Sequence, residues 1–160
     1  MKALVVYDSE FGNTEKAAQA MGEALGSQED VEVLRARDVQ PEQLTGLQYL
    51  IVGSPTQAFQ PTSATKEFLK DIPAQGLAGV KVAAFDTRIS ADDISPTILK
   101  FLLNILIKLF GYAVTPIANG LTKKGGELTV SPEGFYVEDT EGPLKEGELK
   151  RAADWVKQII

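Results

Sequence analysis

The stretch Ser9-Glu10-Phe11-Gly12-Asn13-Thr14 follows directly after the apolar run Ala3–Tyr7. An apolar strand, a short polar turn and a helix form an arrangement that binds phosphate, because backbone N–H groups and the helix dipole both favour an anion. Ser9, Asn13 and Thr14 offer polar donors, and Gly12 lets the backbone approach a phosphate closely. We therefore predict a phosphate-binding loop here, with a plain strand-to-helix turn as the alternative.

A second polar loop follows the apolar run Tyr49–Gly53 and has a proline near each end. Phe59 is an aromatic residue in these polar surroundings, which makes it a candidate to stack on a flat ligand ring. The alternative is that Phe59 packs beneath its own loop. The candidate binding residues of this loop are Pro55, Thr56, Gln57, Ala58 and Phe59.

A third candidate loop, residues 86–92, follows the apolar run Val80–Phe85. Its polar residues Asp86, Thr87 and Arg88 come directly after the expected strand end. Because the carboxyl ends of parallel strands lie at one edge of a sheet, these residues are expected beside the first two loops. Arg88 either faces the ligand or pairs with a nearby aspartate.

The composition limits the chemistry that the chain can perform. It has 160 residues and a net charge of −6, and it contains no cysteine and no histidine. Disulfides, Cys/His zinc sites and Ser-His-Asp triads are therefore excluded. The acidic balance argues against nucleic acid as a partner, because phosphate contacts need clustered lysine and arginine. We expect no catalytic side chain and no metal site, so an organic cofactor would carry any chemistry.

The chain is expected to be cytoplasmic. Its first apolar run, Ala3–Tyr7, is shorter than the apolar core of a signal peptide. No stretch reaches the roughly 18 uninterrupted apolar residues that a membrane-spanning helix needs.

Apolar runs alternate with helical patterns along the chain. This alternation predicts one α/β domain over residues 1–160: a three-layer, doubly wound, five-stranded parallel sheet with helices on both faces. We expect the fifth strand in two pieces around Ser131-Pro132-Glu133-Gly134. The expected strands are 2–7, 31–36, 49–53 and 80–85, followed by the two pieces 127–130 and 135–137. The expected helices are 14–25, 62–70, 98–114, a fourth that begins after an N-cap at Thr115 with Pro116 as its first residue, and a fifth from about residue 146. A helical turn is expected at 38–44.

Other proteins with this architecture lack support in the motifs. A receiver domain needs a phosphorylatable aspartate after the third strand, where this chain has Gly53-Ser54-Pro55-Thr56. The loop at 9–14 matches neither G-x-x-x-x-G-K-[ST] nor G-x-G-x-x-G, so nucleotide binding of those types has no support.

The loop Ser9–Thr14 resembles the phosphate loop of the flavodoxin family, commonly Ser/Thr-x-Thr-Gly-Asn-Thr. Glu10 and Phe11 depart from that pattern, and Glu10 places a negative charge beside the phosphate unless its side chain points to solvent. The order of elements is similar over nearly the whole chain, whereas the second and third loops match only in position and character. The segment 135–149 is similar to a branch of flavodoxin-domain proteins apart from the main line of small electron carriers.

The resemblance implies a flavodoxin-like fold that binds FMN non-covalently, with the phosphate on residues 9–14. It implies an isoalloxazine ring between the loops 54–61 and 86–92, with Phe59 as the stacking residue. Asp86, Thr87 and Arg88 include no second aromatic, so one ring face is either open or covered by Arg88. A flavin beside this cation is expected to be easier to reduce.

The leading function that follows is electron transfer through FMN to or from a redox partner protein, in a carrier rather than a stand-alone enzyme. Two alternatives remain open. One is an FMN-dependent NAD(P)H:quinone-type oxidoreductase, which the open ring face would suit. The other is a flavodoxin-fold interaction domain without flavin.

Residues 98–114 are dense in leucine, isoleucine and phenylalanine, and we expect an apolar helical insertion at about 93–114. Lys100, Asn104 and Lys108 form one narrow polar stripe on this helix, and Gly111 should end or bend it. The segment is either a crossover helix buried on the sheet or the contact surface of a homodimer or a peripheral membrane attachment.

Overall fold

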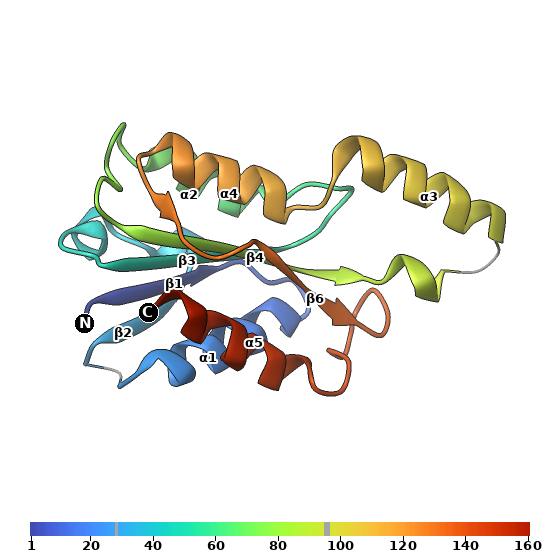
Figure 1. Ribbon diagram of the computed structural model, residues 1–160, viewed down its shortest axis with the longest axis horizontal. Helices are drawn as coiled ribbons and strands as arrows, with labels where there is room; N and C mark the ends of the chain where they lie inside the picture. Colours follow the sequence, from blue (N-terminus) through green and yellow to red (C-terminus); the bar gives the residue numbers. More distant parts are fainter. Residues whose placement is uncertain (28, 95–96) are drawn as a thin grey trace.

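The computed structural model describes residues 1–27, 29–94 and 97–160. Its centre is a parallel sheet in the order β2-β1-β3-β4-β5, in which β6 also pairs with β4 (Figure 1). The sequence leaves this order undetermined, and it belongs to the doubly wound type. The strands are β1 (Ala3–Tyr7), β2 (Val31–Arg35), β3 (Tyr49–Pro55), β4 (Lys81–Ile89), β5 (Glu127–Leu128) and β6 (Glu133–Val137).

Helices cover both faces of the sheet, which confirms the predicted three layers. In Figure 1, α1 and α5 lie on one face, α2 and α4 lie on the other, and α3 extends past the carboxyl ends of β4 and β6. The helices are α1 (Asn13–Leu25), α2 (Ser63–Asp71), α3 (Thr97–Phe110), α4 (Val114–Lys123) and α5 (Glu148–Val156).

The central strands separate two apolar cores because successive side chains of a strand point to opposite faces. All five residues of β1 are buried, with Val5 in the core beneath α1 and α5 and Leu4 in the core beneath α2 and α4. The first core contains the aromatic rings of Phe85, Phe135 and Trp155, which meet edge-on with centroids 5.9 to 6.3 Å apart.

The fifth strand is in two pieces, as predicted. The first, β5, pairs with the start of β4, and the second, β6, pairs with its end. The predicted end of the fourth strand at Phe85 was wrong, however, because β4 continues to Ile89. Asp86 has a register partner on each side, Ser54 in β3 and Gly134 in β6. Pairing on both edges keeps residues 86–88 in the strand instead of a loop.

The predicted helix cap at Thr115 was also wrong. The helix α4 begins at Val114, so that Thr115 and Pro116 both lie in its first turn. Proline is tolerated in the first turn because the N–H groups there have no acceptor within the helix.

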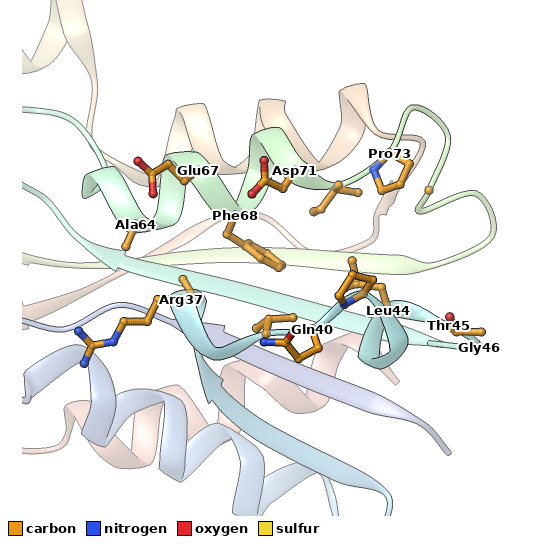
Figure 2. Close-up of a pocket in the computed structure, with 15 residues that line it drawn as sticks. Arg37, Gln40, Leu44, Thr45, Gly46, Ala64, Glu67, Phe68, Asp71 and Pro73 are labelled. Atoms are coloured by element: carbon orange, nitrogen blue, oxygen red, sulfur yellow. The ribbon is translucent and has the colours of Figure 1, made fainter.

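The connection between β2 and β3 contains two short 3₁₀ helices, η1 (Ala36–Asp38) and η2 (Pro41–Leu44), where the sequence predicted a helical turn. This connection and α2 enclose a groove of about 660 Å³. Figure 2 shows the ring of Phe68 pointing from α2 into the groove, whereas the carboxylates of Glu67 and Asp71 point away from it. None of the predicted site residues lines this groove.

The helix α3 is not buried on the sheet. The structure therefore rules out the first alternative for this segment, a crossover helix buried on the sheet. All of its 14 residues are described, and none of them is buried. Its end at Phe110 is followed by Gly111 with a φ of 71°, as the expected helix break requires.

We predict that Gly53→Ala destabilises the protein. A Cβ at this position would lie 2.1 Å from Cζ of Phe85, whose ring is fully buried in the first core. Overpacking of this kind costs about 1–3 kcal/mol, measured as a lower free energy of unfolding in urea. As a control, Gly120→Ala in α4 meets only the flexible end of Leu69 at 3.2 Å. It should be neutral or stabilising, and equal effects of the two substitutions would contradict the packing argument.

Candidate functional site

The N-terminus of α1 is open at the carboxyl end of β1. Gly12 precedes the helix with a φ of 85°, and no side chain caps the first turn. The N–H of Gly12 donates to Oγ of Ser9 at 3.0 Å, which shapes the turn. The first-turn N–H groups of a helix have no acceptor within it, so they and the helix dipole favour an anion at this point.

A cation that the loop itself lacks is supplied by the neighbouring strand. Arg35, at the end of β2, donates from Nη1 to the carbonyl of Ser9 at 3.1 Å and from Nη2 to Glu15 at 3.0 Å. Its position follows from the register, in which Arg35 pairs with Tyr7 at the end of β1. The sequence analysis missed Arg35, because the pairing of β1 with β2 cannot be read from the chain.

Two side chains of the predicted phosphate loop are tied to distant segments. The hydroxyls of Thr14 and Thr87 are 2.7 Å apart and buried. Nδ2 of Asn13 donates to the carbonyl of Glu141 at 3.0 Å. Gly142 must be small here, because a Cβ on it would lie 2.4 Å from Oδ1 of Asn13. The loop is therefore held by β4 and by the segment after β6.

The second loop makes a tight turn with an unusual backbone. Gln57 and Gln60 exchange two N–H···O bonds of 2.9 Å, which encloses Ala58 and Phe59 with φ values of 46° and 68°. Positive φ at two successive non-glycine residues is disfavoured, and such residues cluster at functional sites. The ring of Phe59 contacts that of Phe110 in α3, with centroids 6.1 Å apart.

The first and second loops are joined by one side-chain contact. Nε2 of Gln57 donates to Oε2 of Glu10. Glu10 is exposed, so its carboxylate reaches across the mouth of the site toward the second loop. The charge that departs from the flavodoxin pattern is thus engaged by the side chain of Gln57.

Asp86 is the buried polar centre of the third segment. Its side chain has no exposed surface, and its carboxylate accepts from Nε of Arg88 at 2.5 Å, from Oγ1 of Thr56 at 3.1 Å and from the N–H of Val114 at 2.9 Å. Burial raises the pKa of Asp86 above its ordinary value, while the hydrogen bond from Arg88 opposes this rise. The carboxylate thereby caps α4, which the sequence had assigned to Thr115.

Arg88 is held by more than its pairing with Asp86. Its guanidinium lies 3.6 Å from the ring centroid of Tyr112, which is a close cation–π stack. Gly134 leaves room for it on β6, since a Cβ there would come within 2.3 Å of the guanidinium. The predicted pairing with Asp86 is therefore observed, and Tyr112 is an aromatic residue of the site region that the sequence analysis missed.

A cavity of about 120 Å³ lies where these segments meet. It brings together most of the predicted site residues from all three segments, and Val137, Ile89 and Thr140 add to its wall. Four of the predicted residues do not line it: Gly12, Ala58, Phe59 and Asp86. The predicted residues that line it are Ser9, Glu10, Phe11, Asn13, Thr14, Pro55, Thr56, Gln57, Thr87 and Arg88.

We predict that Asp86→Asn changes the pH dependence of stability. Because burial raises the pKa of Asp86 above 3.8, the folded protein holds this proton more tightly than the unfolded chain does. The free energy of unfolding of the wild type should therefore fall as the pH rises from 3.8 through the folded pKa. The asparagine side chain of the variant cannot ionise, so the variant should lack this decrease in the free energy of unfolding. Urea titrations at a series of pH values measure the difference.

Asp92→Asn is the control for this measurement. Asp92 is exposed, and the hydrogen bond from Lys100 lowers the pKa of its carboxyl group. Its small contribution to the free energy of unfolding therefore rises with pH, whereas the contribution of Asp86 falls. The fall assigned to Asp86 should persist in this control. An unchanged pH profile in Asp86→Asn would contradict the prediction.

Comparison with known proteins places this site in a family. The family model described as Flavodoxin matches residues 5–87, and no curated protein matches the chain. A flavodoxin from the domain Archaea superposes with a TM-score of 0.75 at 22% identity, covering 99% of this chain and 96% of that one.

Two other solved structures show the same fold. Flavodoxin 2 from Bacillus cereus superposes with a TM-score of 0.73 at 22% identity, covering 99% of this chain and 97% of that one. A WrbA-like flavodoxin from Agrobacterium tumefaciens gives a TM-score of 0.69 at 18% identity, with 99% and 94% covered. The match to the family model covers more than half of the chain, includes the loop at 9–14 and the second loop, and extends into β4 as far as Thr87, and the chain therefore belongs to the flavodoxin family.

Proposed function

We propose that this protein binds FMN non-covalently and carries electrons to or from a redox partner protein. The observation that carries the proposal is the uncapped N-terminus of α1, which opens at the end of β1 beside a cavity whose lining includes the neutral polar side chains of Ser9, Asn13 and Thr14. Membership of the flavodoxin family supports the choice of FMN among phosphate-bearing ligands.

The first loop fits the phosphate of FMN. A Cβ at Gly12 would meet no atom within 4 Å, so the space in front of the turn is open. Oγ of Ser9 accepts from Gly12, which leaves its own O–H free to donate to a phosphate oxygen. Arg35 lies behind the loop on the carbonyl of Ser9 and adds a positive charge. A phosphate dianion can be held by such donors together with the helix dipole.

The flavin ring requires more space than the cavity offers. The cavity measures about 120 Å³, whereas small-molecule sites typically measure about 300–1,000 Å³. The segment that can open at low cost is the turn at 57–60, because its contact with Glu10 is exposed and its backbone is unfavourable at Ala58 and Phe59. In this proposal Phe59 leaves Phe110 and stacks on the ring.

Arg88 is positioned for the opposite side of the ring. Asp86 and Tyr112 fix its guanidinium, and its side chain lines the cavity. Bound FMN would supply one-electron and two-electron transfer. The chain itself would contribute the positive charge of Arg88, which favours the negative charge that reduction places on the flavin.

An FMN-dependent NAD(P)H:quinone-type oxidoreductase is the second candidate. The observation in its favour is that residues 86–88 provide no aromatic side chain to cover the second ring face, which leaves access for a substrate. Steady-state oxidation of NADH or NADPH with a quinone would distinguish this enzyme from a carrier. A flavin-free interaction domain would instead purify colourless and take up no added FMN.

The cellular setting is part of the same proposal. We place the protein in the cytoplasm, where it meets its redox partner, with no contact to nucleic acid because its net charge is −6. Within the segment at 98–114, the exposed helix α3 would make the further contact, as a homodimer surface or as a peripheral membrane attachment.

We predict that the apoprotein binds FMN more tightly than riboflavin, by roughly tenfold or more, since only FMN offers charge-assisted hydrogen bonds to the first turn of α1. Quenching of flavin fluorescence measures both affinities. Glu10→Gln should tighten FMN binding by several fold and leave riboflavin unchanged, because it removes a negative charge near the phosphate. Equal affinities for FMN and riboflavin would sink the phosphate assignment.

We predict that Arg88→Gln lowers the midpoint potential of bound FMN by on the order of 30 mV or more, since each 30 mV is about 1.4 kcal/mol for two electrons. Spectroscopic redox titration measures this shift. Arg88→Lys keeps the charge and should stay near the wild type, and Lys145→Gln, which removes a half-buried cation paired with Asp93, should have no effect. An unshifted potential in Arg88→Gln would show that Arg88 lies away from the ring.

A further inference from the structure

The helix α3 carries a wide apolar face that no other part of the described chain covers. Ile98 is 75% exposed, Leu109 70% and Phe101 65%. Monomeric proteins rarely expose contiguous apolar patches of such extent without a binding function. The other exposed apolar residues of the helix are Leu99, Leu102, Ile105, Leu106 and Phe110.

The width of this apolar face indicates whether α3 binds a protein surface or lipid. At 3.6 residues per turn, the apolar side chains from Phe101 round to Ile107 cover about 240° of the helix circumference. Lys100, Asn104 and Lys108 occupy the remaining stripe. One helix that packs on a protein surface buries a stripe of roughly 100°. A second copy of this chain would leave much of the apolar arc in water, whereas lipid acyl chains can surround it.

The helix is attached to the body of the protein along one side. Leu103 and Ile107 are the less exposed residues of its apolar surface. Nζ of Lys100 lies 2.9 Å from Asp92, and the ring of Phe110 contacts Phe59. These contacts join α3 to the rest of the protein near its two ends and leave its most exposed residues uncovered.

The helix α3 is too short to cross a membrane. Its 14 residues span about 21 Å, which is shorter than the hydrocarbon core of about 30 Å. By length and composition alone, Thr97–Lys123 resembles a spanning helix, with a mean hydropathy of 1.7. Its second half is α4, however, where Ile117 and Leu121 have no exposed surface in the core, and Gly111 separates the two helices.

The charges agree with an in-plane arrangement. The only charged residues of α3 are Lys100 and Lys108, both on the polar stripe, where their long side chains can reach the headgroups. The protein as a whole carries a net charge of −6, so attraction to anionic lipid is weak and burial of apolar surface supplies the binding. We infer that α3 anchors the protein to a lipid bilayer by lying in the plane of its interface.

The anchor has a consequence for the redox site, which rests on the proposed function. Both ends of α3 are joined to the site segments, through Asp92 after β4 and through Phe59 in the second loop. Docking of α3 therefore brings the cavity to the bilayer surface. The electron-transfer partner is expected at that surface.

The test is sedimentation of the purified full chain with vesicles of phosphatidylcholine containing a minority of phosphatidylglycerol. The wild type should pellet with the vesicles, and Leu102→Glu should lose roughly tenfold or more of this binding, because it places a charge in the apolar face. Asn104→Glu adds the same charge on the polar stripe and should still pellet. No residue of α3 is buried, so both variants should keep the unfolding curve of the wild type.

Three results would overturn the inference: absence of the wild type from the pellet, equal losses in the two variants, or a dimer in sedimentation velocity that Leu102→Glu dissociates while vesicles bind nothing. The last result would identify a second copy as the partner of α3. Vesicle binding does not require flavin, and flavin absorbance of the same sample reports separately on the proposed function.

Discussion

The buried carboxylate of Asp86 connects the three segments on which the site depends. It accepts hydrogen bonds from Thr56 after β3, from Arg88 in β4 and from the first turn of α4 at Val114. Removing a carboxylate from water is costly unless charge-assisted hydrogen bonds replace the lost hydration. Three donors offset much of that cost here, and the raised pKa of Asp86 shows that burial remains the larger effect. The geometry of Arg88 and the start of α4 both follow from this one group.

The site combines a rigid part with a strained part. The first turn of α1 is fixed by Thr14 on Thr87 and by Asn13 on the carbonyl of Glu141. The second loop instead contains two non-glycine residues with positive φ and is joined to the first by one exposed hydrogen bond. A fixed first turn beside a turn that can rearrange is compatible with the proposal that the small cavity opens to admit a cofactor.

The packing of the sheet explains why α3 lies outside the core. One face is covered by α1 and α5, and the other by α2 and α4 (Figure 1). A 14-residue apolar helix that follows β4 has no uncovered sheet face within reach, so it extends past the carboxyl ends of β4 and β6. Its exposed apolar surface favours binding to a further surface, because leaving it in water costs free energy in proportion to its area.

The sequence by itself determined the alternation of strands with helices, the strand-to-helix turn at 9–14 and the division of the fifth strand, because these depend on local periodicity and turn chemistry. It also indicated the break at Gly111. Only the tertiary structure decided the strand order, and with it the approach of Arg35 to Ser9. Pairing with β3 and β6 on both sides extended β4 through Asp86 and Arg88, and it moved the cap of α4 from Thr115 to Asp86. Such contacts join residues far apart in the chain, which no local pattern records.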